Sequence, residues 1–238
     1  MKLTIGHLYP DLLNLYGDRG NIQCMMKRCQ WRGIDSETIE YTLEDKIDFT
    51  KLDIVLLGGG SDREQMLVCD RLRTIQKDFH DYVEDGGSVI AVCGGYQLLG
   101  HYYDTDEGRI EGLSLVDLYT EQGNPRLIDN IVLQNDAFEH PIVGFENHGG
   151  RTYIGENRPF GRALYGHGNN GEDGTEGVLY KNVVGTYLHG PLLPKNPHIS
   201  DYLIKNALKR KYGTDELTPL DDTQELEANA SIYQRFVK

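Results

Sequence analysis

The chain has 238 residues, a formal net charge of −13 and a sequence pI near 5.0. A surface this acidic repels phosphate backbones and anionic lipids, which argues against nucleic acid and membrane surfaces as partners. Hydrophobic residues make up 39% of the chain and charged residues 26%, a balance typical of a globular protein that buries its own core.

The N-terminus begins directly with a strand-like run, residues 2–8, so we expect no secretory signal and no membrane insertion. We therefore expect a cytoplasmic protein whose cysteines are free thiols: Cys24, Cys29, Cys69 and Cys93. Cys24 and Cys29 are loosely spaced and no second pair exists, so a structural zinc site is not expected.

Short apolar runs alternate with helical patterns through the first half of the chain. This alternation predicts an α/β fold with an open, mostly parallel, twisted sheet and helices on both faces. We expect strands at 3–8, 34–41, 53–57 and 88–92. We expect a helix over 21–32 and one amphipathic helix over 64–85, ended by Gly86-Gly87.

The sequence changes from residue 109 to residue 189, where short apolar runs alternate with glycines and turn residues. This pattern indicates an antiparallel or mixed extension of short strands, with a long loop or hairpin over 155–177. Helices are expected at 198–212 and 226–236. We expect one domain over residues 1–215, followed by a C-terminal tail, 216–238, that can hold a short helix.

Cys93 follows the strand 88–92 directly and precedes two glycines and a helical run. This is the layout of a nucleophile elbow, a tight strand-to-helix turn that pushes the side chain out of the sheet. Gly94 and Gly95 leave room for the strained turn, and the helix N-terminus is expected to favour the reactive thiolate. Taken alone, these residues also fit a buried structural cysteine followed by a glycine turn.

His189 ends an apolar run and is followed by Gly190. An imidazole pKa near neutrality suits it to take a proton from a thiol and return it to a leaving amine. A single histidine is also common as a surface residue, and the chain has eight. Oxyanion donors are expected from the Gly94 amide and from 58–60, a glycine triplet that ends a neighbouring strand and that alone also fits a flexible turn.

Three segments occur in a characteristic order: 56–62 (LLGGGSD), 92–97 (VCGGYQ) and 185–190 (GTYLHG). Together they resemble the class I, triad-type glutamine amidotransferases of flavodoxin-like fold, in the branch that contains cobyric acid synthase. Two further segments, 8–21 (LYPDLLNLYGDRGN) and 146–152 (ENHGGRT), resemble the GatD family, the glutaminase subunits of lipid II isoglutaminyl synthases.

The resemblance implies a role for each matching position. The nucleophile, the general base and acid, and two oxyanion amides fall on Cys93, His189, Gly59 and Gly94. The amino-acid end of a glutamine substrate is expected to contact Gln97, Arg126, Asn147 and Gly149. For Arg126, a guanidinium suits an α-carboxylate through a forked pair of hydrogen bonds.

One position departs from the superfamily. Many members carry a glutamate two residues after the histidine, where it orients the imidazole, and Pro191 stands there in this chain. Because an unoriented imidazole is a poorer base, we hypothesise that the missing carboxylate comes from a partner or from elsewhere in this chain. A carboxylate from the partner would couple activity to assembly.

We expect no metal and no cofactor in this chain, because thiol chemistry on glutamine needs none. No segment indicates an ATP site. The resemblance implies a heterodimer with a Mur-ligase-like synthetase subunit that uses ATP and magnesium. That subunit would amidate the D-glutamate of lipid II to D-isoglutamine in peptidoglycan synthesis.

Three alternatives stay open. The chain could be a glutaminase subunit of a different amidating synthetase, or a non-catalytic, amidotransferase-like regulatory subunit that Pro191 would suit. It could also be a thiol hydrolase with another substrate on the same fold.

Overall fold

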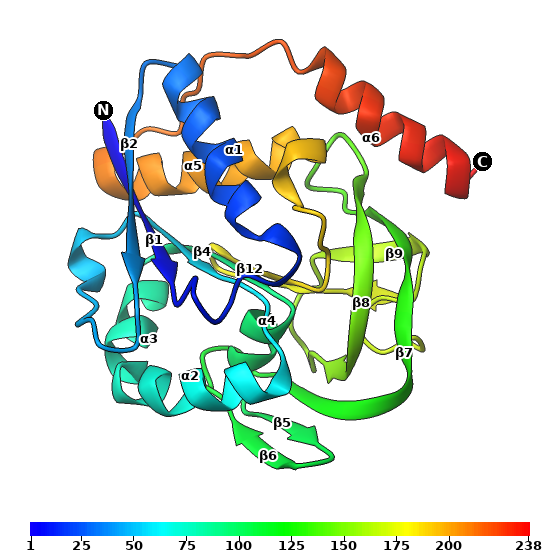
Figure 1. The fold of residues 1–238 in the computed structure, drawn as a ribbon. Helices are drawn as coiled ribbons and strands as arrows, with labels where there is room; N and C mark the ends of the chain where they lie inside the picture. Colours follow the sequence, from blue (N-terminus) through cyan, green and yellow to red (C-terminus); the bar gives the residue numbers. More distant parts are fainter.

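A mostly parallel sheet forms the centre of the computed structural model, which describes residues 1–238 except for the side chain of Tyr16. The strand order is β2-β1-β3-β4-β12-β11, and only β11 runs antiparallel to its neighbour (Figure 1). The predicted open sheet is thus confirmed, with a flavodoxin-like order. Its strands are β1 (Lys2–Leu8), β2 (Asp35–Tyr41), β3 (Ile54–Leu57), β4 (Ser88–Val92), β11 (Val178–Tyr180) and β12 (Val183–Thr186).

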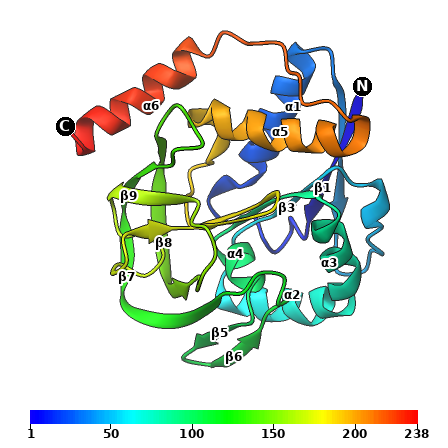
Figure 2. The ribbon, with the colours of Figure 1, turned by 180° about the vertical axis from the view of Figure 1, so that it is seen from behind.

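Helices cover both faces of this sheet, as predicted (Figures 1 and 2). One face carries α1 (Arg19–Trp31) and α5 (Pro197–Tyr212), and the other carries α2 (Asp62–Thr74), α3 (Gln76–Glu84) and α4 (Gly94–Leu98). Every residue of β3 and β4 is buried between them. Short 3-10 turns lie at η1 (Leu15–Gly17), η2 (Phe49–Lys51) and η3 (Leu193–Lys195).

The single helix expected over 64–85 is wrong, because the chain breaks at Ile75 into α2 and α3. Ile75 has φ −114° and ψ 10°, outside the helical region. The break allows Phe79 of α3 to stack on Phe49 of η2 with ring centroids 4.9 Å apart. Periodicity could not reveal it, because buried residues continue in one phase through the break: Val68, Leu72, Ile75, Phe79 and Val83.

The second sheet is antiparallel except for the β5–β7 pair, which confirms the predicted extension. The expectation of short strands is wrong for two of its members, which have 16 and 12 residues. Glycines that suggested turns lie inside the longer strands, where they permit close approach: a Cβ on Gly144 would lie 2.8 Å from Leu188 Cγ. The strands are β5 (Tyr102–Thr105), β6 (Gly108–Glu111), β7 (Tyr119–Gln134), β8 (Ile142–Tyr153), β9 (Gly161–Tyr165) and β10 (Thr175–Glu176). The hairpin expected within 155–177 is formed by β9 and β10.

The C-terminal helix α6 (Thr223–Phe236) lies along the second sheet (Figure 2). The buried guanidinium of Arg28 joins α6 to α1 and α5, the two helices on one face of the main sheet. Arg28 Nε donates to Asp201 on α5 at 2.7 Å, and Nη1 donates to Asp222, the residue before α6, at 2.6 Å. Asn229 of α6 donates to the carbonyls of Pro141 and Lys195. The end of the chain is therefore part of the packed structure.

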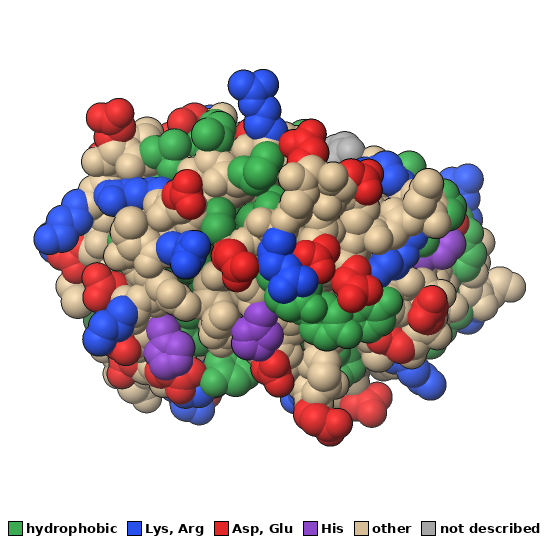
Figure 3. Space-filling view, turned by 90° about the horizontal axis from the view of Figure 1, so that it is seen from below, with side chains coloured by type: hydrophobic (Ala, Val, Ile, Leu, Met, Phe, Trp, Pro, Cys, Tyr) green, Lys and Arg blue, Asp and Glu red, His purple; other side chains and the backbone are tan. Residues whose placement is uncertain are grey.

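On the face drawn in Figure 3, acidic and basic side chains are interspersed. None of the helices in the described part of the chain combines the length and the apolar character needed to cross a bilayer.

Replacing Asp222 by Asn should destabilise the protein, because the buried Arg28 guanidinium loses one of its two carboxylates. We expect a loss of about 2 kcal/mol in the free energy of unfolding, the range of a hydrogen bond to a charged group. Urea denaturation measures it. The matched control is Asp221→Asn, which changes an exposed carboxylate that bonds only within its own turn, to Thr223. Equal effects from both substitutions would contradict this role for Arg28.

Candidate active site

The site lies at the carboxyl edge of the main sheet, where three neighbouring parallel strands end together. Leu57 of β3 pairs with Ala91 of β4, and Val92 pairs with Thr186 of β12. The Cys93 amide donates to the Thr186 carbonyl at 2.8 Å. The glycine triplet, the cysteine and the segment leading to the histidine therefore begin at the same level, as the sequence predicted.

Cys93 lies at a tight strand-to-helix turn with the layout of a nucleophile elbow, and its backbone has φ 51° and ψ −109°. Such a backbone costs about 1–3 kcal/mol for a residue with a Cβ. The following glycines are required by their surroundings: a Cβ on Gly95 would clash with the Leu57 carbonyl oxygen, and one on Gly94 would lie 2.8 Å from Gln65 Cδ. The predicted strained turn is confirmed.

His189 is fixed by the second sheet. Its amide donates to the Phe145 carbonyl of β8 at 2.7 Å, and the Phe145 amide donates back at 3.3 Å. A Cβ placed on Gly59 would lie 3.1 Å from Cys93 Cβ and 3.4 Å from His189 Cε1. The thiol, the imidazole and the Gly59 backbone thus surround one small volume.

Burial controls the charge of this pair. It raises the pKa of the Cys93 thiol to about 12, with a further upward contribution from the charge of Asp18. Burial also lowers the pKa of His189 to about 4, and the nearby His148 and Arg126 add to this effect. The resting pair is a neutral thiol and a neutral imidazole. The expected stabilisation of the thiolate is outweighed by desolvation, which is the largest cause of the raised pKa of Cys93.

An in-chain carboxylate that the sequence did not identify also reaches the site. Asp18 is fully buried, its Oδ2 accepts from the Gly59 amide at 2.7 Å, and its Oδ1 lies 3.9 Å from His189 Nδ1. Burial raises the pKa of this carboxyl to about 7. The segment 8–21 resembles the GatD family in sequence, but the sequence alone suggested no role for Asp18. One feature of the sequence could have indicated this role: Asp18 follows β1, which pairs with β3, the strand that leads to Gly59.

Pro191, two residues after His189, has a packing role. A Cβ on Gly20, at the start of α1, would lie 2.5 Å from Pro191 Cγ. The contact places the segment that carries Asp18 against the segment that carries His189.

Three residues expected to hold the amino-acid end of a substrate lie together. Arg126 Nε donates to Asn147 Oδ1 at 3.1 Å, and its Nη2 donates to the Asn147 carbonyl at 3.0 Å. A Cβ on Gly149 would lie 3.4 Å from Arg126 Nη1. The positive charge of Arg126 lowers the pKa of both Cys93 and His189, so its charge acts on both side chains.

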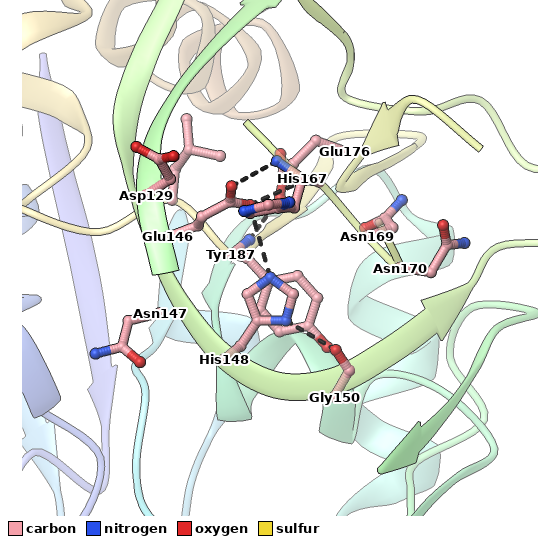
Figure 4. Close-up of polar contacts among 12 residues, drawn as sticks. Asp129, Glu146, Asn147, His148, Gly150, His167, Asn169, Asn170, Glu176 and Tyr187 are labelled. Atoms are coloured by element: carbon pink, nitrogen blue, oxygen red, sulfur yellow. Dashed lines mark hydrogen bonds and ion pairs between the residues drawn. The ribbon is translucent and has the colours of Figure 1, made fainter. Parts of the chain in front are cut away.

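Gln97 belongs to a buried polar cluster, of which Figure 4 shows Tyr187, His148 and Glu146. Its Nε2 donates to the Tyr187 hydroxyl at 3.1 Å. The Tyr187 ring is stacked on His148, with centroids 3.6 Å apart and planes 5° apart. His148 Nδ1 donates to the Gly150 carbonyl at 2.8 Å, and its Nε2 lies 3.7 Å from the buried carboxylate of Glu146. Gln97 is therefore held in place by groups that the sequence analysis did not assign.

The described residues contain no group of three or more histidine, cysteine, aspartate or glutamate side chains that could hold a metal ion. The four cysteines are free. The expectation of a reaction without cofactor stays a prediction.

Alkylation of Cys93 by iodoacetamide should rise about tenfold per pH unit between pH 7 and 9 without a plateau. The reason is that the thiolate fraction grows with pH throughout the range below a thiol pKa of about 12. Mass spectrometry of the Cys93 peptide measures the rate. His189→Ala should leave the slope unchanged, because the imidazole is neutral throughout. A plateau near pH 7 would show that the thiol is already activated.

Comparisons with known proteins agree with this geometry. Residues 4–197 match the CobB/CobQ-like glutamine amidotransferase domain. The chain is 45% identical to subunit GatD of the glutamine-hydrolyzing lipid II isoglutaminyl synthase of Staphylococcus aureus (strain N315), over 98% of this chain and 96% of that protein. The same subunit of Streptococcus pneumoniae (strain ATCC BAA-255 / R6) is 42% identical, over 92% and 85%.

Two more distant matches place the fold and the branch. A probable cobyric acid synthase of Methanocaldococcus jannaschii is 34% identical over 66% of this chain, which spans 34% of that protein. The structure of PurLQS from Thermotoga maritima matches with a TM-score of 0.57 and 22% sequence identity. The match covers 88% of this chain and 99% of the matched chain, and it shows the fold alone. The match over most of the chain and the site at the sheet edge lead to one conclusion: this chain belongs to the CobB/CobQ-like glutamine amidotransferase family.

Proposed function

We propose that this chain is the glutaminase subunit of a lipid II isoglutaminyl synthase and releases ammonia from glutamine through a thioester on Cys93. The observation that carries the proposal is the similarity to GatD over nearly the whole of both chains, together with the meeting of Cys93, His189 and the Gly59 backbone. The family's CobB/CobQ-like domain fits the same chemistry.

In this mechanism, His189 takes the proton of Cys93, and the thiolate attacks the carboxamide carbon of glutamine. A sulfur–carbon bond forms and the oxygen becomes an oxyanion, stabilised by the amides of Gly59 and Gly94. Collapse breaks the carbon–nitrogen bond, and the ammonia leaves with the proton from His189. Water, deprotonated by the same histidine, then hydrolyses the γ-glutamyl thioester to glutamate and restores the thiol.

The amino-acid end of glutamine would bind where Arg126, Asn147 and Gly149 lie together. The guanidinium would pair with the α-carboxylate, and Asn147 and Gln97 offer polar groups to the α-amino side. Because the Arg126 guanidinium already donates to Asn147, the α-carboxylate of glutamine would either replace Asn147 as the acceptor or share the guanidinium with it.

A partner is part of the proposal. Ammonia lost to water would become ammonium, which is not a nucleophile, so it is best used at an adjoining active site. We propose a Mur-ligase-like subunit that binds ATP and magnesium and amidates the D-glutamate of lipid II, in a cytoplasmic heterodimer. The relatives' designation as a subunit supports an assembly of this kind. The neutral resting pair supports gating by that assembly, because proton transfer from so weak an acid to so weak a base is unfavourable.

The alternatives are less well supported. The probable cobyric acid synthase matches over only 34% of its own length, so about two thirds of that protein lies outside the similarity, unlike the GatD subunits. A regulatory subunit would not need the strained backbone at Cys93, which costs stability without a catalytic return.

The decisive test is glutamate release from glutamine by the wild type and by Cys93→Ala, each alone and with a co-expressed Mur-ligase-like partner. We expect release that requires Cys93 and increases strongly with the partner. Cys24→Ala is the matched control, because this cysteine lies away from the site beside Ser200. No release from a correctly folded, confirmed complex would exclude the catalytic function.

Replacing Arg126 by Lys should raise the KM for glutamine about tenfold or more with a smaller change in kcat. Lysine keeps the charge but loses the forked geometry, and a hydrogen bond to a charged group contributes about 1.5–3 kcal/mol. Steady-state kinetics measure the split. Arg162→Lys makes the same chemical change at an exposed position of β9 and should leave both constants unaltered. An unchanged KM in Arg126→Lys would remove this residue from the substrate site.

A further inference from the structure

The side chain of Asp18 does not serve its own helix. It occupies the N-cap position of α1, where aspartate usually accepts hydrogen bonds from the first amides of the helix, yet it makes no such bond. Its Oδ2 instead accepts from the Gly59 amide at 2.7 Å, 41 residues away in the sequence. Its Oδ1 is buried, has no hydrogen-bond partner among the described residues, and lies 3.9 Å from His189 Nδ1.

The chain holds this carboxylate in place by close backbone packing. A Cβ on Gly58 would clash with the Leu13 carbonyl oxygen, and the Leu15 amide donates to the Gly59 carbonyl at 2.9 Å. On the other side, Gly20 lies against Pro191. Burial of a carboxylate costs free energy and raises its pKa to about 7 here, so the arrangement is not explained by stability.

The position of Asp18 conflicts with the reaction chemistry. The Gly59 amide has one hydrogen, and the oxyanion of the attacked glutamine needs it. A Cβ on Gly59 would lie 3.6 Å from Asp18 Oδ2, close to its distances from Cys93 and His189, so the carboxylate stands in the volume of the reacting groups. Its negative charge also raises the pKa of the Cys93 thiol.

We propose that Asp18 is a further active-site residue, an internal carboxylate that occupies the oxyanion amide of Gly59 in the resting chain and must leave before the glutamine oxygen can bind. The inference rests on the proposed glutaminase function. Within the segment 16–21 (YGDRGN), Asp18 would therefore keep the Cys93 nucleophile inactive in the resting chain.

The geometry distinguishes this role from that of a third catalytic carboxylate. An acid that orients an imidazole accepts its N–H at hydrogen-bond distance, whereas Asp18 makes its short contact to Gly59 and stays 3.9 Å from His189. The two roles predict opposite effects of substitution.

The test compares Asp18→Ala and Asp18→Asn with the wild type in glutamate release by the full chain, alone and with the partner. For the chain alone, kcat/KM should increase about tenfold or more in Asp18→Ala, the factor expected for losing a charge-assisted hydrogen bond. Asp18→Asn should increase less, because its neutral carbonyl can still accept from Gly59. The reverse order, with alanine the slowest and kcat reduced, would identify a catalytic acid and overturn the proposal. So would three equal rates.

A second readout does not depend on glutamine turnover. Iodoacetamide should alkylate Cys93 faster in both Asp18 variants than in the wild type at pH 7.5. Asp62→Asn is the matched control, since Asp62 also raises the pKa of Cys93 by its charge but does not bond Gly59. Alkylation that increases no more in the Asp18 variants than in Asp62→Asn would overturn the proposal. If no protein releases glutamate while the alkylation order holds, the glutaminase function fails, and what remains for Asp18 is its suppression of the reactivity of the Cys93 thiol. Asp18→Asn is isosteric, so the test does not depend on the folding of Asp18→Ala.

Discussion

The parallel pairing of β4 with β12 is the constraint on which the site depends. The Cys93 amide donates to the Thr186 carbonyl, so the elbow and the segment that leads to His189 start from adjacent points of one edge. The pairing of β3 with β4 adds the Gly59 backbone on the other side. A shift of one residue in either register would turn the thiol or the imidazole to the opposite face of the sheet.

The same burial that makes this arrangement rigid also sets its charges. Water is excluded from Cys93, His189 and Asp18 alike, so each is driven toward its neutral form. Hydrogen bonds in this buried site are stronger than those on the surface, so replacing one acceptor by another changes the free energy of the site by a large amount. The Gly59 amide is the clearest case, because a single donor lies within reach of a resident carboxylate and of the expected oxyanion.

Much of the fold and of the site was predictable because it follows from local pattern. Buried strands followed by glycines gave the sheet, the elbow at Cys93 and the edge at which His189 would lie. Asp18 was not predictable, because its bond to Gly59 joins distant segments and no periodicity encodes it. The break at Ile75 leaves the apolar phase intact, and Gly144 looks like a turn residue until its contact with Leu188 is seen. The same holds for the buried cluster around Gln97, which depends on the stacking of His148 on Tyr187.

The reciprocal hydrogen bonds between the backbones of Phe145 and His189 make the second sheet part of the support of the candidate site. Strand β8 is itself clamped to η3, where Asn196 accepts from the Val143 amide at 2.9 Å and donates to the Val143 carbonyl at 2.8 Å. The imidazole thus owes its position to side chains that never approach a substrate. A change at Asn196 would therefore be felt at the imidazole, although Asn196 itself bonds strand β8 and not His189.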